Sequence, residues 1–420
     1  YQSRPPLCHP TSRRAVAPAW YRECPPMPSQ AEMIARMAQD RYTLAQRLDG
    51  VANTAREKRL GIWNTILNIE ITTGSTFLLA MPEAAPYIVV GLTRETLAIA
   101  RPGKGGDKFW GYLNRRYGLN EHEGQNNIAR YVLSQFRSYA IENGARVALR
   151  RFAAVRDQTV YMSAYNNSMW RIDGQDVMPI ENGEDDVFFA DDDGGIPIEP
   201  SVGANSVLFD RLINCVSFTE SGMGGISAEQ MCQAYTVWIF ALAFPDLMPT
   251  KPLLIVEGSP GSGKSSCTQL LQLALLGKTK PIMLSRNKED DFGTLLLRSP
   301  ICVLDNLDAY IDWVPDAVAA YTTGGEWTKR KLFTDTDEIT IRPHAFIAVA
   351  SKNPVSFRRE DVADRCLIMR LDRRKQFTSF ETLKQQILEL RPQILGEYLF
   401  YVNQIVAEIR AGVPQVDETF

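Results

Sequence analysis

The chain has 420 residues, more than one ordinary hydrophobic core holds, so two or three domains are expected. Its composition, with 45% hydrophobic and 23% charged residues and a formal net charge of -3, is that of a globular protein and excludes bulk basicity as a means of binding nucleic acid. The longest apolar run, VWIFALAF at 237–244, is too short to span a bilayer, which excludes a membrane partner and predicts a buried helix.

Residues 1–30 contain seven prolines, which predicts a flexible lead-in. Cys8, His9 and Cys24 leave open a partial zinc site there, but with no second metal-spaced pair nearby a Pro-rich arm is favoured. Because the chain starts at Tyr1 rather than Met, we expect a fragment or trimmed product and read no signal peptide. Seven cysteines without paired spacing favour a reducing, cytoplasmic compartment.

Residues 31–200 are expected to form an accessory domain. Helical spacing runs from residue 31 and again over 109–143, and the period then changes to alternation in RVALRRFAAV, TVYMSAY and MWRIDG, which predicts an antiparallel meander. The arginines around this meander are either solvated or a DNA contact, and solvated arginines are favoured. Seven acids between 181 and 195 predict a solvated loop rather than a docking tail.

Residues 201–378 alternate short apolar strands with helices, namely LLIVEG, PIMLS, ICVLDN, AFIAVAS and LIMRL with the segments between them. This alternation predicts an α/β domain with a mostly parallel sheet covered by helices. Residues 379–420 are helical again, and we expect them to form a C-terminal lid or appendage.

The stretch GSPGSGKSS at 258–266 fits the phosphate-loop pattern and lies between an apolar strand and an apolar helix. Glycines let backbone N–H groups face phosphate, the helix offers its positive N-terminus, Lys264 reaches the β and γ oxygens, and Ser265 ligates Mg²⁺. The pattern therefore predicts binding of ATP with Mg²⁺. The predicted nucleotide-binding residues are Gly258, Gly261, Ser262, Gly263, Lys264, Ser265 and Ser266.

A second metal-binding acid is expected at the end of a neighbouring strand, and Asp305 in ICVLDN fits this position. Asn306 follows it, where many hydrolytic ATPases have a catalytic glutamate. The base that activates water therefore stays unassigned, with Asp308 and Glu257 as candidates that serve equally well as surface acids or caps.

Two strand-like arms, at about 327–333 and 338–342, flank the turn TDTD and predict a hairpin that carries Lys329, Arg330 and Lys331. These basic residues are either a DNA contact or the ordinary lysine-rich edge of a strand. Asn353, at the end of the next strand, is placed to orient the lytic water or contact the γ-phosphate.

Together, GSPGSGKSS, ICVLDN, TGGEWTKRKLFTD, SKNP and DVADRCLIMRL resemble the AAA+ helicases of superfamily 3, and more closely the primase-helicase ATPases of phages and mobile elements. The resemblance covers about residues 210–410. It implies an AAA+ fold and a homo-oligomeric ring, commonly a hexamer, that hydrolyses ATP between subunits and moves along a DNA strand in its channel. Asn306 resembles the pattern of some such relatives but departs from the acidic pair of the better understood ones.

In related rings an arginine just before a strand crosses to the neighbouring subunit's γ-phosphate, and Arg365 has this position, with Arg358 and Arg359 as alternatives. The resemblance favours a replicative helicase that acts on forked duplex DNA and has a primase or replication-initiation partner. An AAA+ switch that assembles on DNA or protein without unwinding is the rival interpretation. A small-molecule phosphotransferase shares only the phosphate loop.

Overall fold

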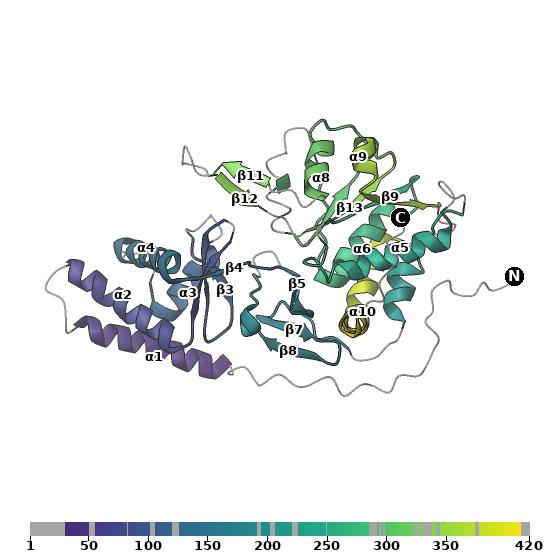
Figure 1. Cartoon of the computed structure of the whole chain (residues 1–420). Coiled ribbons are helices and arrows are strands. Elements are labelled where there is room, and N and C mark those ends of the chain that lie inside the picture. Colours follow the sequence, from purple (N-terminus) through teal and green to yellow (C-terminus); the bar gives the residue numbers. More distant parts are fainter. Residues whose placement is uncertain are drawn as a thin grey trace. The chain divides into compact units, whose positions relative to one another are not determined.

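The structure, a computed structural model, describes residues 30–49, 55–81, 83–100, 106–119, 126–190, 195–201, 206–220, 226–248, 250–284, 292–293, 296, 299–322, 327–330, 338–341, 345–373 and 378–412 (Figure 1). The chain forms two compact units. The smaller comprises the residues of these ranges within 23–150 and 180–192, and the larger those within 151–179 and 193–420. The expected lead-in at 1–30, including Cys8, His9 and Cys24, lies outside the described ranges except for its last residue.

The smaller unit packs four helices on a four-stranded sheet. The helices are α1 (Gln30–Asp49), α2 (Ala55–Thr72), α3 (Asp107–Tyr117) and α4 (Asn126–Asn143), and the strands, in sheet order, are β3 (Thr96–Ala98), β2 (Ala85–Val89), β1 (Thr76–Ala80) and β4 (Ala145–Val147). Its core is aromatic, with Phe136 in contact with Trp63, Phe77 and Phe109. The helical blocks predicted here are confirmed, and α3 and α4 divide the block predicted at 109–143.

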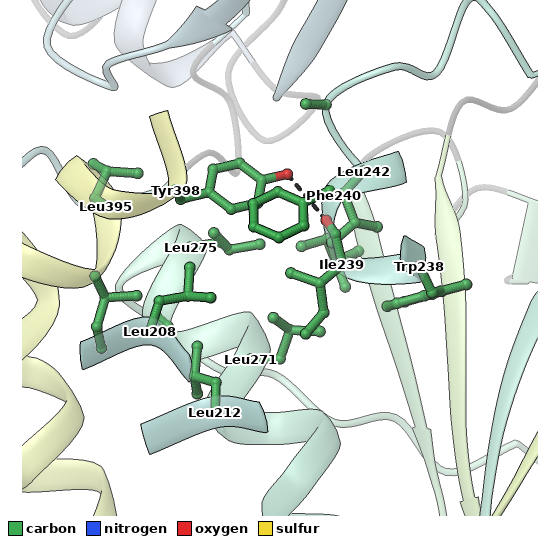
Figure 2. Close-up of a cluster of buried hydrophobic side chains, with 14 of the residues drawn as sticks. Leu208, Leu212, Trp238, Ile239, Phe240, Leu242, Leu271, Leu275, Leu395 and Tyr398 are labelled. Atoms are coloured by element: carbon green, nitrogen blue, oxygen red, sulfur yellow. Dashed lines mark hydrogen bonds between the residues drawn. The ribbon is translucent and has the colours of Figure 1, made fainter. Parts of the chain in front are cut away.

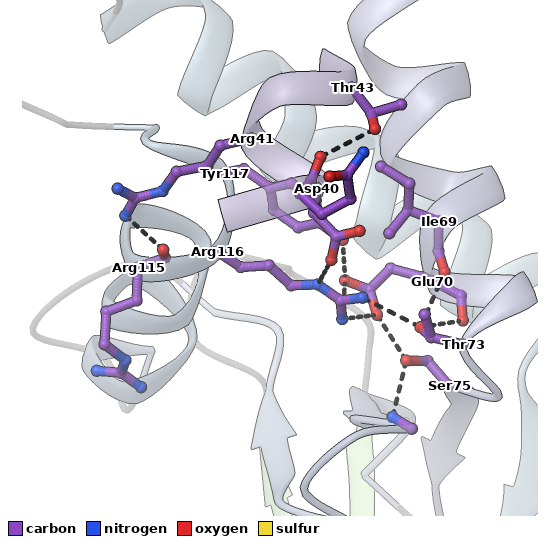
Figure 3. A network of polar contacts seen from close by, with 12 residues as sticks. Asp40, Arg41, Thr43, Ile69, Glu70, Thr73, Ser75, Arg115, Arg116 and Tyr117 are labelled. Carbon is purple, nitrogen blue, oxygen red and sulfur yellow. Dashed lines mark hydrogen bonds and ion pairs between the residues drawn. The ribbon is translucent and has the colours of Figure 1, made fainter. Parts of the chain in front are cut away.

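A fully buried ion pair joins three helices of this unit (Figure 3). Arg116 on α3 contacts Glu70 on α2 at 3.3 Å and Asp40 on α1 at 2.9 Å. The hydroxyls of Tyr112 and Tyr117 each donate to Glu70 Oε1 at 2.5 Å. Burial and then the Glu70 carboxylate raise the pKa of both tyrosines, so each stays protonated and able to donate. Hydrogen bonds therefore compensate both buried charges.

Replacing Arg116 with methionine should destabilise this unit by about 3 to 5 kcal/mol, because Glu70 would be left as a buried charge without its counter-ion. The measurement is the opening free energy of α2 and α3 from native-state hydrogen exchange. Glu70→Gln added to Arg116→Met should restore part of the stability, since both charges are then removed. Unchanged hydrogen exchange of α2 and α3 in Arg116→Met alone would contradict this account.

The larger unit begins with an antiparallel sheet of four strands in sequential order, β5 (Ala153–Arg156), β6 (Thr159–Ser163), β7 (Ser168–Ile172) and β8 (Val177–Glu181), and the last two residues of β8 belong to the smaller unit. The predicted meander is confirmed, and its first turn has Asp157 and Gln158 at positive φ, as a two-residue hairpin requires. RVALRRFAAV is not one strand, however. Its first part belongs to β4, which pairs with β1, and only its end enters the meander.

The meander was expected to share a domain with the preceding helices, whereas the structure places its first three strands in the larger unit. The physical reason is its contact with α10 (Phe380–Ala411). Gly174 N–H donates to Asn403 Oδ1 at 2.9 Å, and a Cβ on Gly174 would lie 2.8 Å from the Ala407 nitrogen. Arg410 also donates to the Gln158 carbonyl at 3.1 Å.

A parallel sheet is the centre of the larger unit. Its strands, in sheet order, are β10 (Ile301–Asp305), β13 (Phe346–Ser351), β9 (Leu253–Gly258) and β14 (Cys366–Leu371). All three pairings are parallel, and the four strands are almost wholly apolar, as a sheet covered on both faces requires. The predicted α/β class is thereby confirmed. The part of PIMLS that the structure describes, residues 281–284, is not a strand: Ile282 forms a single bridge to Leu304.

Helices pack around this sheet, chiefly α5 (Ala228–Ala241), α6 (Lys264–Leu276), α8 (Val314–Thr322) and the short α9 (Glu360–Ala363). Helix α10 packs against α6. A capping box formed by Ser227 and Gln230 begins α5, which contains much of the apolar run predicted to be buried. Within the described residues, no helix is both long and apolar enough to cross a bilayer.

The C-terminal helix α10 is part of the core, not the lid or appendage expected for 379–420. Tyr398, Leu399 and Val402 are fully buried in the same apolar cluster as α5 and α6. Figure 2 shows Tyr398 and Leu395 facing Phe240 of α5 and Leu275 of α6, and the Tyr398 hydroxyl donates to the Ile239 carbonyl at 3.1 Å. Helical periodicity predicts the apolar face but not its partner.

Candidate active site

The glycine-rich loop joins β9 to α6 and needs its glycines for backbone reasons. Gly261 and Gly263 have φ values of +81° and +86°, a backbone conformation that residues other than glycine rarely adopt. A Cβ on Gly258 would lie 2.3 Å from Ser262 Oγ. Ser262 is itself fully buried, and its hydroxyl has no hydrogen-bond partner within the described part of the chain.

Helix α6 begins at Lys264, so the loop leads directly into the positive end of a helix of 13 residues. The N–H groups of the first helical turn have no partner within the helix, and they are available to an anion at this end. The structure thus collects in one loop and one turn all the residues predicted to bind the phosphates, from 258 to 266.

Asp305 lies at the carboxyl end of β10 and meets α6. Its Oδ1 accepts from Ser265 Oγ at 2.8 Å, and its Oδ2 accepts from Gln269 Nε2 at 3.2 Å. Ser265 and Gln269 are one helical turn apart, so they present both donors on one face. Mg²⁺ prefers oxygen ligands, and a hydroxyl and a carboxylate both supply them. A bound Mg²⁺ ion usually has few protein ligands, and water and phosphate oxygens complete its coordination shell. The residues present therefore fit Mg²⁺.

Asn306, directly after Asp305, is exposed and has a φ of +58°. Asparagine tolerates this left-handed conformation better than most residues. Its N–H donates to the Ala350 carbonyl of the adjacent strand at 3.0 Å, so the bonding to β13 extends to Asn306, and the positive φ then turns the chain away from the strand direction.

The two candidate bases both have partners. Glu257 lies opposite Arg370 in the β9–β14 pairing, and the two side chains form an ion pair at 3.2 Å. Asp308 Oδ1 accepts from Ser351 Oγ at 2.7 Å and from the N–H of Lys352 at 2.7 Å. Partial burial raises the pKa of Asp308, but these bonds and the positive charge of Lys264 outweigh it and hold the pKa below its usual value.

Asn353 is exposed and follows β13, two residues after Ser351, which pairs with Glu257 near the glycine-rich loop. Its N–H donates to Asp308 Oδ1 at 3.3 Å. Arg358 donates to its side-chain Oδ1. Asn353 is therefore fixed by groups of its own chain at the same end of the sheet as Lys264 and Asp305.

Arg365 lies at the opposite end of the sheet. It directly precedes β14, whose first residue pairs with Leu253, and β9 runs from there to the loop at Gly258. Five residues at about 3.3 Å each place Arg365 roughly 16 Å from the loop of its own chain. Its Nη1 donates to the Ala319 carbonyl of α8 at 2.8 Å. Arg359 is exposed and pairs with Asp316 and Asp361, both at 2.6 Å.

The predicted basic hairpin is present between α8 and β13. Its strands are β11 (Trp327–Arg330) and β12 (Glu338–Ile341), which pair antiparallel and form a two-stranded sheet separate from the parallel one (Figure 1). Lys329 and Arg330 lie in β11, opposite Ile339 and Glu338. Lys331 lies outside the described residues.

Two residues near the loop are not among the site residues predicted from the sequence. Gln269 contacts Asp305, and Arg373 approaches the loop, with its Nε 3.7 Å from the position that a Cβ on Gly261 would take. Gln269 is one helical turn after Ser265, a spacing from which its position beside the motif could have been inferred. Arg373 could not be found in this way, because its position depends on β14 pairing with β9.

A family of replication proteins matches the part of the chain that contains this site. The model of the family described as "Actinomycete integrative conjugative element replication protein" matches residues 210–417. No curated protein matches the sequence. Among solved structures, the NrS-1 C terminal region aligns with a TM-score of 0.46 and 11% identity over 81% of this chain and 70% of that chain. A JCV helicase aligns with a TM-score of 0.28 and 13% identity over 44% of this chain and 57% of that chain.

Proposed function

We propose that this protein is an ATP-driven DNA helicase that serves the replication of a mobile genetic element. The observation that carries the proposal is the 2.8 Å contact between Ser265 and Asp305, directly behind a glycine-rich loop that begins a helix. Together they present phosphate-binding N–H groups, a lysine and two Mg²⁺ ligands at one end of a parallel sheet. The match of residues 210–417 to replication proteins of integrative conjugative elements supports the biological setting.

In this proposal the loop and Lys264 hold the β and γ phosphates, while Ser265 and Asp305 hold Mg²⁺. Bound Mg²⁺ would neutralise negative charge that develops on the phosphate oxygens. Asn353 reaches toward the γ-phosphate or the attacking water, and Asn306 lies where the chain turns beside Asp305. The unit that contains these residues would be an AAA+ ATPase domain.

The proposed function also requires several copies of the chain to assemble into a homo-oligomeric ring, which we propose to be a hexamer. Arg365 is too far from the loop of its own chain to contact a nucleotide there, so a neighbouring subunit's site is the one it would serve. The β11–β12 hairpin, separate from the parallel sheet, would carry Lys329, Arg330 and Lys331 to a DNA strand in the channel.

The test is a triple alanine variant of Lys329, Arg330 and Lys331. If these residues neutralise phosphates, the slope of log affinity for single-stranded DNA against log salt should become shallower by roughly 0.7 for each phosphate that is no longer neutralised. Stimulation of ATP hydrolysis by single-stranded DNA and displacement of a strand from a forked duplex should both collapse. The measurements are a salt titration of binding and a strand-displacement assay on assembled protein.

The matched control removes the same number of positive charges elsewhere, by changing Arg56, Lys58 and Arg59 of α2 to alanine. Its strand displacement should stay near that of the unchanged protein. Full displacement by the hairpin variant would instead show an ordinary solvated edge strand. If the unchanged protein hydrolyses ATP and binds DNA yet displaces no strand, it is a switch rather than a helicase.

A further inference from the structure

Three hydrogen bonds converge on a single oxygen of Asp308. Ser351 Oγ and the N–H groups of Lys352 and Asn353 all donate to Oδ1, at 2.7, 2.7 and 3.3 Å. The three donors are consecutive residues at the end of β13, and Ser351 is fully buried. This carboxylate oxygen therefore contacts three consecutive residues of the turn that carries Asn353, and the Asn353 N–H also donates to Ser351 Oγ at 3.1 Å.

The side chain of Asn353 is oriented from the other side. Arg358 donates to its Oδ1. A guanidinium has donors and no acceptor, so the amide atom that faces it must be the oxygen. The NH₂ group of Asn353 is then left to donate, which suits a phosphate oxygen or the oxygen of a water molecule.

We propose that Asp308 and Arg358 are positioning residues that fix Asn353, and that Asp308 does not take the proton from the attacking water. This inference rests on the proposed ATPase function and deepens it. The Oδ1 of Asp308 already accepts three bonds and cannot take a proton without losing them, so only Oδ2 would be left to act as a base. Its lowered pKa also makes it a poorer proton acceptor.

The two roles separate in Asp308→Asn and Asp308→Ala. An asparagine keeps an Oδ1 that accepts the same three bonds, more weakly than a charged oxygen, so turnover should stay within about threefold of the unchanged protein. Alanine has no acceptor, and displacement of Asn353 should lower turnover on the order of 10²-fold while ATP affinity changes little. A base would behave differently, because asparagine cannot take a proton: turnover of Asp308→Asn would fall about 10² to 10⁴-fold.

Hydrogen exchange of the Lys352 amide, which donates to Asp308 Oδ1 at 2.7 Å, provides a readout that does not require hydrolysis. Protection should persist in Asp308→Asn and fall in Asp308→Ala, with the strands of the sheet unchanged in both. If the unchanged protein fails to hydrolyse ATP, the proposed function fails, and exchange still decides whether Asp308 holds the turn. Loss of turnover in Asp308→Asn with protection intact would overturn the proposal and identify Asp308 as the base.

Arg358 is tested in mixed assemblies. If Arg358 orients Asn353 of its own chain, each Arg358→Ala subunit and each Lys264→Ala subunit has an impaired nucleotide site of its own, and no site in a mixed assembly is intact. Mixing the two variants should then restore no activity beyond the sum of the separate proteins. Recovery in the mixture would show that Arg358 acts on the neighbouring subunit and would overturn its assignment to Asn353.

Discussion

Replacing Lys264 with alanine is expected to reduce ATP hydrolysis by a factor on the order of 10³ or more, and Asp305→Ala should do the same by a different route. Lys264 supplies positive charge at the phosphates, so its removal weakens nucleotide binding and turnover together. Asp305 supplies a metal ligand, so its removal should leave binding of ATP without Mg²⁺ nearly unchanged. The measurements are turnover and nucleotide affinity, each with and without Mg²⁺.

The matched control is Lys384→Ala, which removes an exposed lysine that pairs with Glu381 on α10 at 3.4 Å. Exposed pairs of this kind contribute little to stability, so its turnover should equal that of the unchanged protein. Turnover at the unchanged level in either Lys264→Ala or Asp305→Ala would remove the nucleotide-site assignment.

The strand, loop and helix around residues 253–276 could be predicted because their signals are local. An apolar strand, glycines at positions that need positive φ and an apolar helix follow one another without any long-range partner. The same holds for the meander, whose turn residues, among them Asp157, Gln158, Asn167 and Gly174, have positive φ and are visible in the sequence. Local patterns also predict Asp305 at a strand end, which is where the structure has it.

The contacts between distant segments could not be predicted in this way. The periodicity of α10 indicates one apolar face and is the same for an appendage as for a core helix. Glu70 and Arg116 are charged and would be expected at the surface, yet both are fully buried, because their compensation comes from three separate helices. Asp308 is a candidate base in the sequence, and only the structure shows the turn that it holds.

Substitution of Arg365 by alanine should lower turnover on the order of a thousandfold if its guanidinium completes a neighbouring subunit's site. Each subunit should still bind nucleotide, because its own loop is unchanged. A purely structural role predicts much less, since the contact with the Ala319 carbonyl is one hydrogen bond worth about 0.5 to 1.5 kcal/mol of stability. Arg365→Lys keeps a donor for that carbonyl but not the planar fork, so it should be stable and nearly inactive.

Mixing Arg365→Ala with Lys264→Ala subunits distinguishes the two roles most directly. At some boundaries the intact loop of an Arg365→Ala subunit would meet the intact arginine of a Lys264→Ala subunit, and activity should return there. Lys384→Ala is again the control, because this exposed lysine pairs with Glu381 of its own helix, so its removal should change turnover little. If assemblies proven to be mixed recover no activity, Arg365 does not act across a subunit boundary, and its bond to α8 is then its only assigned role.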